Sequence, residues 1–208
     1  MKIFDKIFSS KPKSIYKFIE EGNINEIKDY LSGTKDLNSD FQIESILHYA
    51  INNCYNNYFK TIEFLINNGA DINSHHSKLL ETPLHRLCAR AKPQIDVITM
   101  ILEKGAEVNS INISGKTPVF HCNFSYSVEL LNLLVKYGAD INITNKYKNT
   151  LLHDDYINCL DEHFEEFLKA LIGLGFDINS RNSSGLTPLD FCENEKIGNI
   201  LIRYGGTR

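Results

Sequence analysis

The sequence predicts an all-α protein, a solenoid of about six stacked helix–turn–helix repeats with loop or hairpin tips. The first observation is a recurring motif whose clearest copy is Thr82-Pro83-Leu84-His85. Its lead residues stand at positions 45, 82, 117, 150 and 187, so the intervals are 37, 35, 33 and 37. The second is an apolar helix after each of the first four copies, which ends in Gly and then, two residues later, in Asp/Glu-Ile/Val-Asn. Two markers in fixed order, at a constant period, indicate a repeat architecture.

Each residue of the motif suits the start of a helix. Thr82 is a preferred N-cap, whose hydroxyl accepts a backbone N–H, and Pro83 suits the first helical position. His85 is placed to hydrogen-bond back to the Thr82 hydroxyl or to a neighbouring loop. His48 and His153 occupy the same slot in other copies, so we interpret all three histidines as structural.

A period near 33 residues with Thr-Pro-Leu-His resembles the ankyrin repeat, and the resemblance covers roughly residues 13–206. It implies an L-shaped stack of antiparallel helix pairs with loops at right angles to them. It also implies a non-catalytic protein that binds another protein through a concave face of loop tips and inner helices.

The repeats predict one domain over residues 1–208. Residues 1–38 form an N-terminal cap helix and a degenerate first repeat, 39–180 form four central repeats, and 181–208 form a short C-terminal capping repeat. Residues 1–11 place Ile3, Phe4, Ile7 and Phe8 on one helical face. A helix that caps the first repeat is the favoured interpretation, and a membrane-surface or partner-docking helix is the alternative.

The elements follow in chain order. Residues 15–19 and 27–31 predict the first helix pair, with Gly22-Asn23 as the turn, and the second pair begins at Ile46 and near Lys60. The fifth repeat is widened at residues 155–162, and the sixth is short. The polar tips between repeats are residues 75–80, 111–116, 143–149 and 180–186. Gly115 and Gly185 supply turns with positive φ, whereas the first tip has Leu79-Leu80 where the family usually shows Gly.

Composition narrows the possible functions. The 208 residues include 22 Lys and Arg against 26 Asp and Glu, a net charge of −4 that gives no electrostatic case for nucleic acid. No run approaches the roughly 18 apolar residues of a membrane span. The five cysteines are odd in number and spread one per repeat, which favours free thiols in a reducing, cytoplasmic compartment. Secretion into a host cell stays open.

We expect no enzyme activity, cofactor or bound metal. His75, His76 and His85 lack a carboxylate or thiolate at a metal-binding spacing. His121 and Cys122 are adjacent in sequence, so on a helix they point apart and cannot act on each other. No set of residues has the arrangement that catalysis requires.

Residues 161–166 are strongly acidic. The favoured interpretation is a solvated loop followed by the acidic start of the fifth outer helix. The alternative is a docking surface for a basic partner.

Superposing the repeats predicts which side chains face a partner protein. The predicted residues are Phe41, Gln42, Glu44, Tyr49, Asn52, Lys78, Leu79, Glu81, Arg86, Arg90, Ile113, Lys116, His121, Phe124, Tyr126, Tyr147, Asp154 and Ile157. The aromatic and Arg residues among them are the proposed energetic anchors, because such side chains often dominate binding. The alternative is that scattered exposed aromatics carry no function. A monomer that acts as an adaptor, as an immunity protein against a bacterial toxin, or as an effector delivered into a host cell would use such a face.

Overall fold

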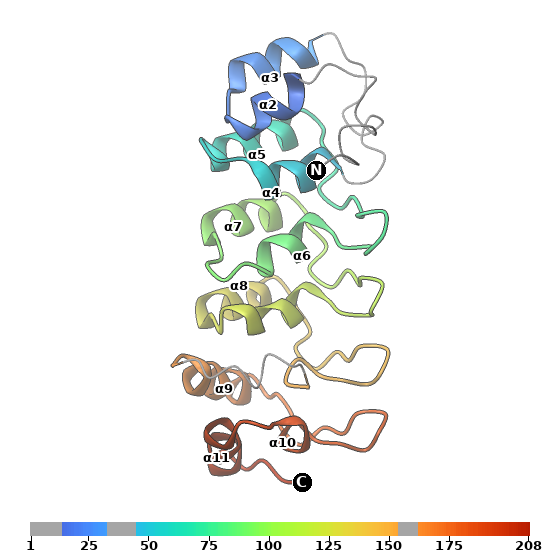
Figure 1. Cartoon of the computed structure of the whole chain (residues 1–208), viewed down its shortest axis with the longest axis vertical. Helices are drawn as coiled ribbons and strands as arrows, with labels where there is room; N and C mark the ends of the chain where they lie inside the picture. Colours follow the sequence, from blue (N-terminus) through green and yellow to red (C-terminus); the bar gives the residue numbers. More distant parts are fainter. Residues whose placement is uncertain (1–13, 33–44, 154–161) are drawn as a thin grey trace. The chain divides into compact units, whose positions relative to one another are not determined.

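The structure is a computed structural model that describes residues 14–32, 45–153 and 162–208 (Figure 1). It divides into two compact units, Met1–Ser77 and Lys78–Arg208, and each is described by itself. The helix expected in residues 1–11 lies outside the described residues, as does the inner helix of the fifth repeat.

The first unit contains two helix pairs where the sequence predicted them. Its helices are α2 (Ser14–Glu20), α3 (Ile24–Leu31), α4 (Ile46–Asn53) and α5 (Tyr58–Asn67). The Asn23 side chain accepts from the amide of Glu26 and so caps α3. Gly22 is required before it, because a Cβ at that position would lie 1.9 Å from the carbonyl oxygen of Asn56.

The second unit continues the same pattern, with short inner helices and longer outer ones. Its elements are α6 (Pro83–Cys88), α7 (Ile95–Glu103), η1 (Pro118–Phe124), α8 (Val128–Lys136), α9 (Phe164–Gly173), α10 (Pro188–Phe191) and α11 (Glu195–Arg203). The outer helices lie along one side of the unit and the loops between repeats project from the opposite side (Figure 1). No β-strand occurs in the three described stretches, which agrees with the predicted all-α class.

Two buried histidines of the second unit, His85 and His153, tie the motif that opens a repeat to the next loop. Nδ1 of His85 lies 2.8 Å from the Thr82 hydroxyl and 3.1 Å from the Thr82 amide nitrogen. An amide N–H can only donate, so Nδ1 accepts and the proton sits on Nε2, which donates to the carbonyl of Lys116 at 3.1 Å. His153 makes the same bonds to Thr150 and Leu186, which confirms the structural role predicted for these histidines.

The fourth repeat departs from this arrangement because Phe120 stands where the motif has His. Its inner element η1 is a 3₁₀ helix rather than the expected α-helix, and Thr117 makes no side-chain cap. The Thr117 hydroxyl is buried and finds no hydrogen-bond partner among the described residues. A seven-residue 3₁₀ run is unusually long.

The Asn that ends the Asp/Glu-Ile/Val-Asn segment of a repeat also forms hydrogen bonds with the next repeat. The Asn109 side chain donates to the carbonyl of Gly138 at 2.8 Å and accepts from the amide of Asp140 at 3.0 Å. Asn179 does the same with the Gly205 carbonyl and the Thr207 amide, at 2.9 Å and 2.8 Å. These two side chains therefore link consecutive repeats of the second unit.

The loops between repeats of the second unit, here called the tip loops, are residues 78–81, 111–116, 143–149 and 180–186. Backbone hydrogen bonds join each loop to the next. The amide of Ile113 donates to Leu79 at 2.9 Å, that of Lys146 to Ser114 at 3.4 Å, and that of Ser183 to Tyr147 at 2.8 Å. Within three of the loops an Asn side chain accepts from two amides further along: Asn112, Asn145 and Asn182. The tip loops thus form one hydrogen-bonded row.

One position of every tip loop is left-handed. Gly115 and Gly185 occupy it with φ of 76° and 78°. Leu80 and Lys148 occupy it in the other two loops, with φ of 52° and 55°. A side chain at such a φ strains the backbone by about 1–2 kcal/mol, whereas glycine adopts it without a steric cost.

The cap bonds predict opposite outcomes for two matched substitutions. Thr82→Val removes a hydroxyl bonded to His85 and should lower the free energy of unfolding by about 1–2 kcal/mol. Thr117→Val removes a buried hydroxyl with no partner and should leave that free energy unchanged or raise it. Urea denaturation followed by circular dichroism measures both, and an equal loss in the two variants would contradict the description of Thr117.

The left-handed position predicts a stabilising substitution. Lys148→Gly relieves the backbone strain and should raise the free energy of unfolding by about 1 kcal/mol. Lys146→Gly, in the same loop but outside the left-handed residues, is the control and should be neutral or destabilising. A thermal or urea melt that ranks the two variants the other way round would refute the strain argument.

Candidate functional site

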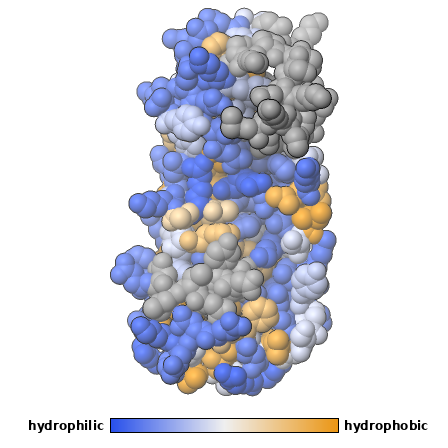
Figure 2. All heavy atoms as spheres, viewed as in Figure 1, coloured by the Kyte–Doolittle hydropathy of each residue, from blue (hydrophilic) through white to orange (hydrophobic). Residues whose placement is uncertain are grey.

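Most of the exposed apolar side chains of the described residues lie on the tip loops. Nine large apolar side chains of the described residues are exposed, and six of them are Leu79, Leu80, Ile111, Ile113, Tyr147 and Leu186. In the space-filling view an apolar group stands at the edge from which these loops project (Figure 2). An exposed group of apolar side chains is typical of an interaction site.

The tip loops are also basic. They hold five cations and one carboxylate: Lys78, Lys116, Lys146, Lys148 and Arg181, against Glu81. The carboxylate is largely buried and pairs with the guanidinium of Arg86 at 2.8 Å. The local charge is therefore opposite in sign to the net charge of the chain, which is −4.

The structure exposes several of the residues predicted to face a partner. Leu79, Ile113 and Tyr147 are 40%, 47% and 67% exposed, and Lys78 is exposed as well. Lys116, Arg90 and Phe124 are partly exposed. Five of these residues belong to the tip loops, whereas Arg90 follows the C-terminal end of α6 and Phe124 is the last residue of η1.

Two predicted residues are buried instead. Tyr126 is 4% exposed, with its ring centroid 5.4 Å from that of Phe164 and 5.6 Å from that of Phe167. It belongs to the core between α8 and α9, so the prediction of a partner-facing ring is wrong for Tyr126. His121 is 9% exposed and packs between His85 and Phe124, at ring distances of 5.9 Å and 5.7 Å.

In the first unit, Tyr49 serves the fold. Its hydroxyl donates to Glu20 at 2.5 Å and its ring meets Tyr16 edge-on at 4.6 Å. Asn52 is exposed on the same helix. The remaining predicted residues lie outside the described part of the chain: Phe41, Gln42, Glu44, Asp154 and Ile157.

The sequence prediction missed Leu80, Ile111, Lys146, Lys148 and Leu186. All five are exposed tip-loop residues. Alignment of the loops was the available signal, because Leu80 and Lys148 stand opposite Gly115 and Gly185.

One carboxylate of the acidic segment of residues 161–166 is bound by other side chains of the same molecule. Glu165 accepts from the hydroxyl of Tyr204 at 2.9 Å and pairs with Arg203 and Lys169 at 3.2 Å and 3.4 Å. These contacts lower the pKa of the Glu165 carboxyl, the Tyr204 hydrogen bond contributing most. Glu165 thus joins α9 to α11, which favours the structural interpretation over a docking role for this residue.

The described residues offer little reactive chemistry. Burial raises the pKa of the thiols of Cys88 and Cys122, so both stay protonated and unreactive. Within residues 14–32, 45–153 and 162–208, no three His, Cys, Asp or Glu side chains are grouped to hold a metal ion. No described helix is long and apolar enough to cross a membrane.

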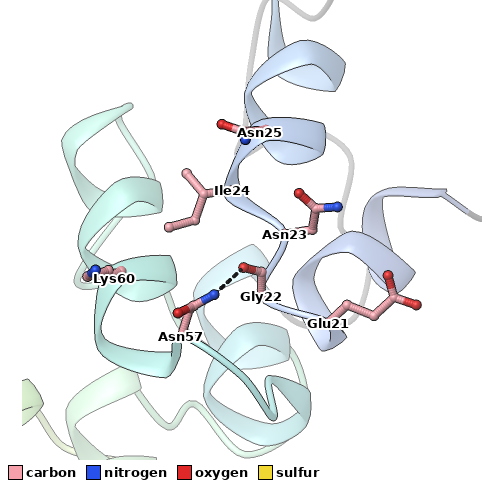
Figure 3. A pocket seen from close by; sticks show the side chains of 7 residues that line it. All are labelled: Glu21, Gly22, Asn23, Ile24, Asn25, Asn57 and Lys60. Atoms are coloured by element: carbon pink, nitrogen blue, oxygen red, sulfur yellow. Dashed lines mark hydrogen bonds between the residues drawn. The ribbon is translucent and has the colours of Figure 1, made fainter.

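A pocket of about 600 Å³ lies in the first unit, where the α2–α3 turn meets the loop before α5 (Figure 3). Its lining is mostly polar, and the Asn57 amide there donates to the carbonyl of Gly22 at 3.1 Å. Because this polar group already serves the contact between two helix pairs, we interpret the pocket as a packing seam.

Comparison with known proteins accounts for the repeats. Residues 47–145 match the family model for ankyrin repeats in three copies. A Fowlpox virus protein named as an ankyrin repeat protein is 34% identical over 114 residues, which cover 52% of this chain and 18% of that protein. A Rickettsia felis protein named in the same way is 30% identical over 135 residues, 61% of this chain and 58% of that protein.

Human Ankyrin repeat and SOCS box protein 16 is 30% identical over 64% of this chain and 28% of its own length. The chain therefore spans well under two thirds of the length of these relatives. The crystal structure of EF0377, an ankyrin repeat protein, superposes with a TM-score of 0.74 over 94% of this chain and 99% of that one, at 21% identity. Residues 47–145 therefore carry ankyrin repeats, and the chain shares its fold with a solved ankyrin-repeat protein.

Proposed function

We propose that the protein binds another protein through the tip loops and the adjoining partly exposed residues of α6 and η1. Ankyrin repeats are generally non-catalytic protein–protein interaction modules. The observation that supports this proposal is that the tip loops hold six of the nine large apolar side chains that are exposed in the described part of the chain. Removing such side chains from water is the main favourable term in most protein association.

The hydrogen bonds that join the tip loops favour binding. Inter-loop hydrogen bonds and the Asn side chains hold the backbone of the tip loops before a partner arrives. A surface ordered in advance loses less conformational entropy on association. Arg86 is held by Glu81 of the first tip loop, and Phe124 is stacked on His121 at the end of η1; both extend the proposed surface along the inner elements.

An immunity protein and a host-directed effector would both use this surface. An immunity protein would use it to block a cognate toxin, and a host-directed effector would use it on a host protein. The relatives come from viruses, bacteria and vertebrates, and their names state neither role. A toxin gene beside this gene would favour immunity, and a secretion-dependent phenotype would favour an effector. The free thiols of Cys54, Cys88, Cys122 and Cys192 fit the proposed reducing, cytoplasmic location.

The proposal predicts that apolar substitutions weaken binding at the tip loops and nowhere else on the second unit. Leu79→Ser with Ile113→Ser should reduce capture of the partner from native lysate by at least about tenfold, since central apolar contacts carry most of the binding energy. Quantitative mass spectrometry of the captured proteins measures the change.

The matched control is Leu174→Ser with Ile202→Ser. These side chains are similarly exposed, at 38% and 57%, but lie on the outer-helix side. The control should capture the same partner as the wild type, with both variants melting like the wild type. Loss of capture in the control together with full capture by the tip variant would place binding on the outer helices.

A further inference from the structure

The left-handed position of the tip loops gives a second, independent sign of function. Glycine fills it in two loops, so the fold itself accepts glycine there. Leu80 and Lys148 hold side chains at the same position with φ of 52° and 55°. Backbone strain of this kind is enriched at functional sites. It also occurs outside the tip loops at Asn57 and Tyr126, with φ of 50° and 45°, but among the described residues Leu80 and Lys148 are the two that stand where other loops have glycine.

The two strained residues present different chemistry. Leu80 is 44% exposed and lies in the same loop as Leu79, whose carbonyl accepts from the amide of Ile113. Lys148 is exposed and follows Tyr147, whose ring is 67% exposed. Leu80 therefore adds to an apolar group, and Lys148 is a cation next in sequence to an exposed aromatic ring.

The positive charge of the tip loops indicates the chemistry of the partner that Leu80 and Lys148 would contact. The tip loops carry five cations, and their single carboxylate is occupied by Arg86. A partner segment that lies along the row gains from carboxylates and is repelled if it is basic. Aliphatic side chains such as Leu79, Leu80 and Ile113 have no counterpart in a phosphate backbone, so the mixture favours a protein segment over nucleic acid.

We propose that Leu80 and Lys148 are paired anchors for an acidic protein segment that also carries apolar side chains. Leu80 packs against the apolar side chains of that segment, and Lys148 pairs with one of its carboxylates. This inference rests on the proposed function and adds to it the chemistry of the partner.

Peptide display tests the chemistry directly. Phage carrying random 16-residue peptides are selected on the wild-type protein, and the enriched peptides are synthesised for affinity measurement. The enriched sequences should combine Asp or Glu with Leu, Ile, Met or Phe. Their affinity for the wild type should fall as salt is raised, because surface ion pairs are screened.

The variants separate binding from stability. Leu80→Gly and Lys148→Gly should each weaken these peptides about fivefold or more while making the protein more stable, a combination that a merely structural role would not produce. Lys148→Arg should retain most of the affinity, because the charge stays. Lys146→Gly should have the smaller effect, and Leu174→Ser with Ile202→Ser should have none.

Each other outcome overturns the inference. Enrichment of neutral or basic peptides, or normal peptide binding by both glycine variants, would reject Leu80 and Lys148 as anchors. The proposed function would still stand if the variant with Leu79→Ser and Ile113→Ser fails to bind its partner. Peptides indifferent to every tip-loop variant, or an absence of any enriched peptide, count against both. Tip-dependent binding of a single-stranded oligonucleotide in place of peptides identifies the surface as a nucleic-acid site.

Discussion

Neutral, buried imidazoles at His85 and His153 fix two of the repeats of residues 78–208 to the loop that follows each of them. In His85, Nδ1 faces the amide of Thr82 and Nε2 faces the carbonyl of Lys116. A proton on Nδ1 would set two donors against each other, so these bonds need the uncharged ring. Burial acts in the same direction at His153, where it lowers the pKa of the ring. The helix start and the next tip loop are thereby fixed to one rigid side chain.

The fourth repeat lacks this link. Phe120 has no polar atom to reach the next loop, which is held by the amide side-chain bonds that the neighbouring loops also have. Asn145 accepts from two of its amides, and the Asn149 side chain accepts from Asn182 at 2.9 Å. The loop that carries Tyr147 and Lys148 is therefore held within the row, although its own inner element is an uncapped 3₁₀ helix.

Local rules of capping and turn formation were enough to predict most of the fold. They identified the N-caps at Thr82 and Thr187 and the role of His85, because each depends on residues three apart. The burial of Tyr126 was not predictable in this way, since it depends on Phe164 and Phe167 of the next repeat. The exposed apolar residues Leu79 and Ile113 were predicted, but Lys148 was not. The alignment places Lys148 opposite Gly115 and Gly185, but its positive φ is a property of the folded backbone.

The central claim is that a partner protein covers the tip loops of residues 78–208. Hydrogen–deuterium exchange of the protein, alone and bound to a captured protein or selected peptide, tests it most directly, because a covered loop exchanges its amides more slowly. We expect protection at the exposed amides of residues 78–81, 111–116 and 143–149, with α7, α8 and α11 unchanged. Protection confined to these outer helices, with the tip loops exchanging as in the free protein, would contradict the account.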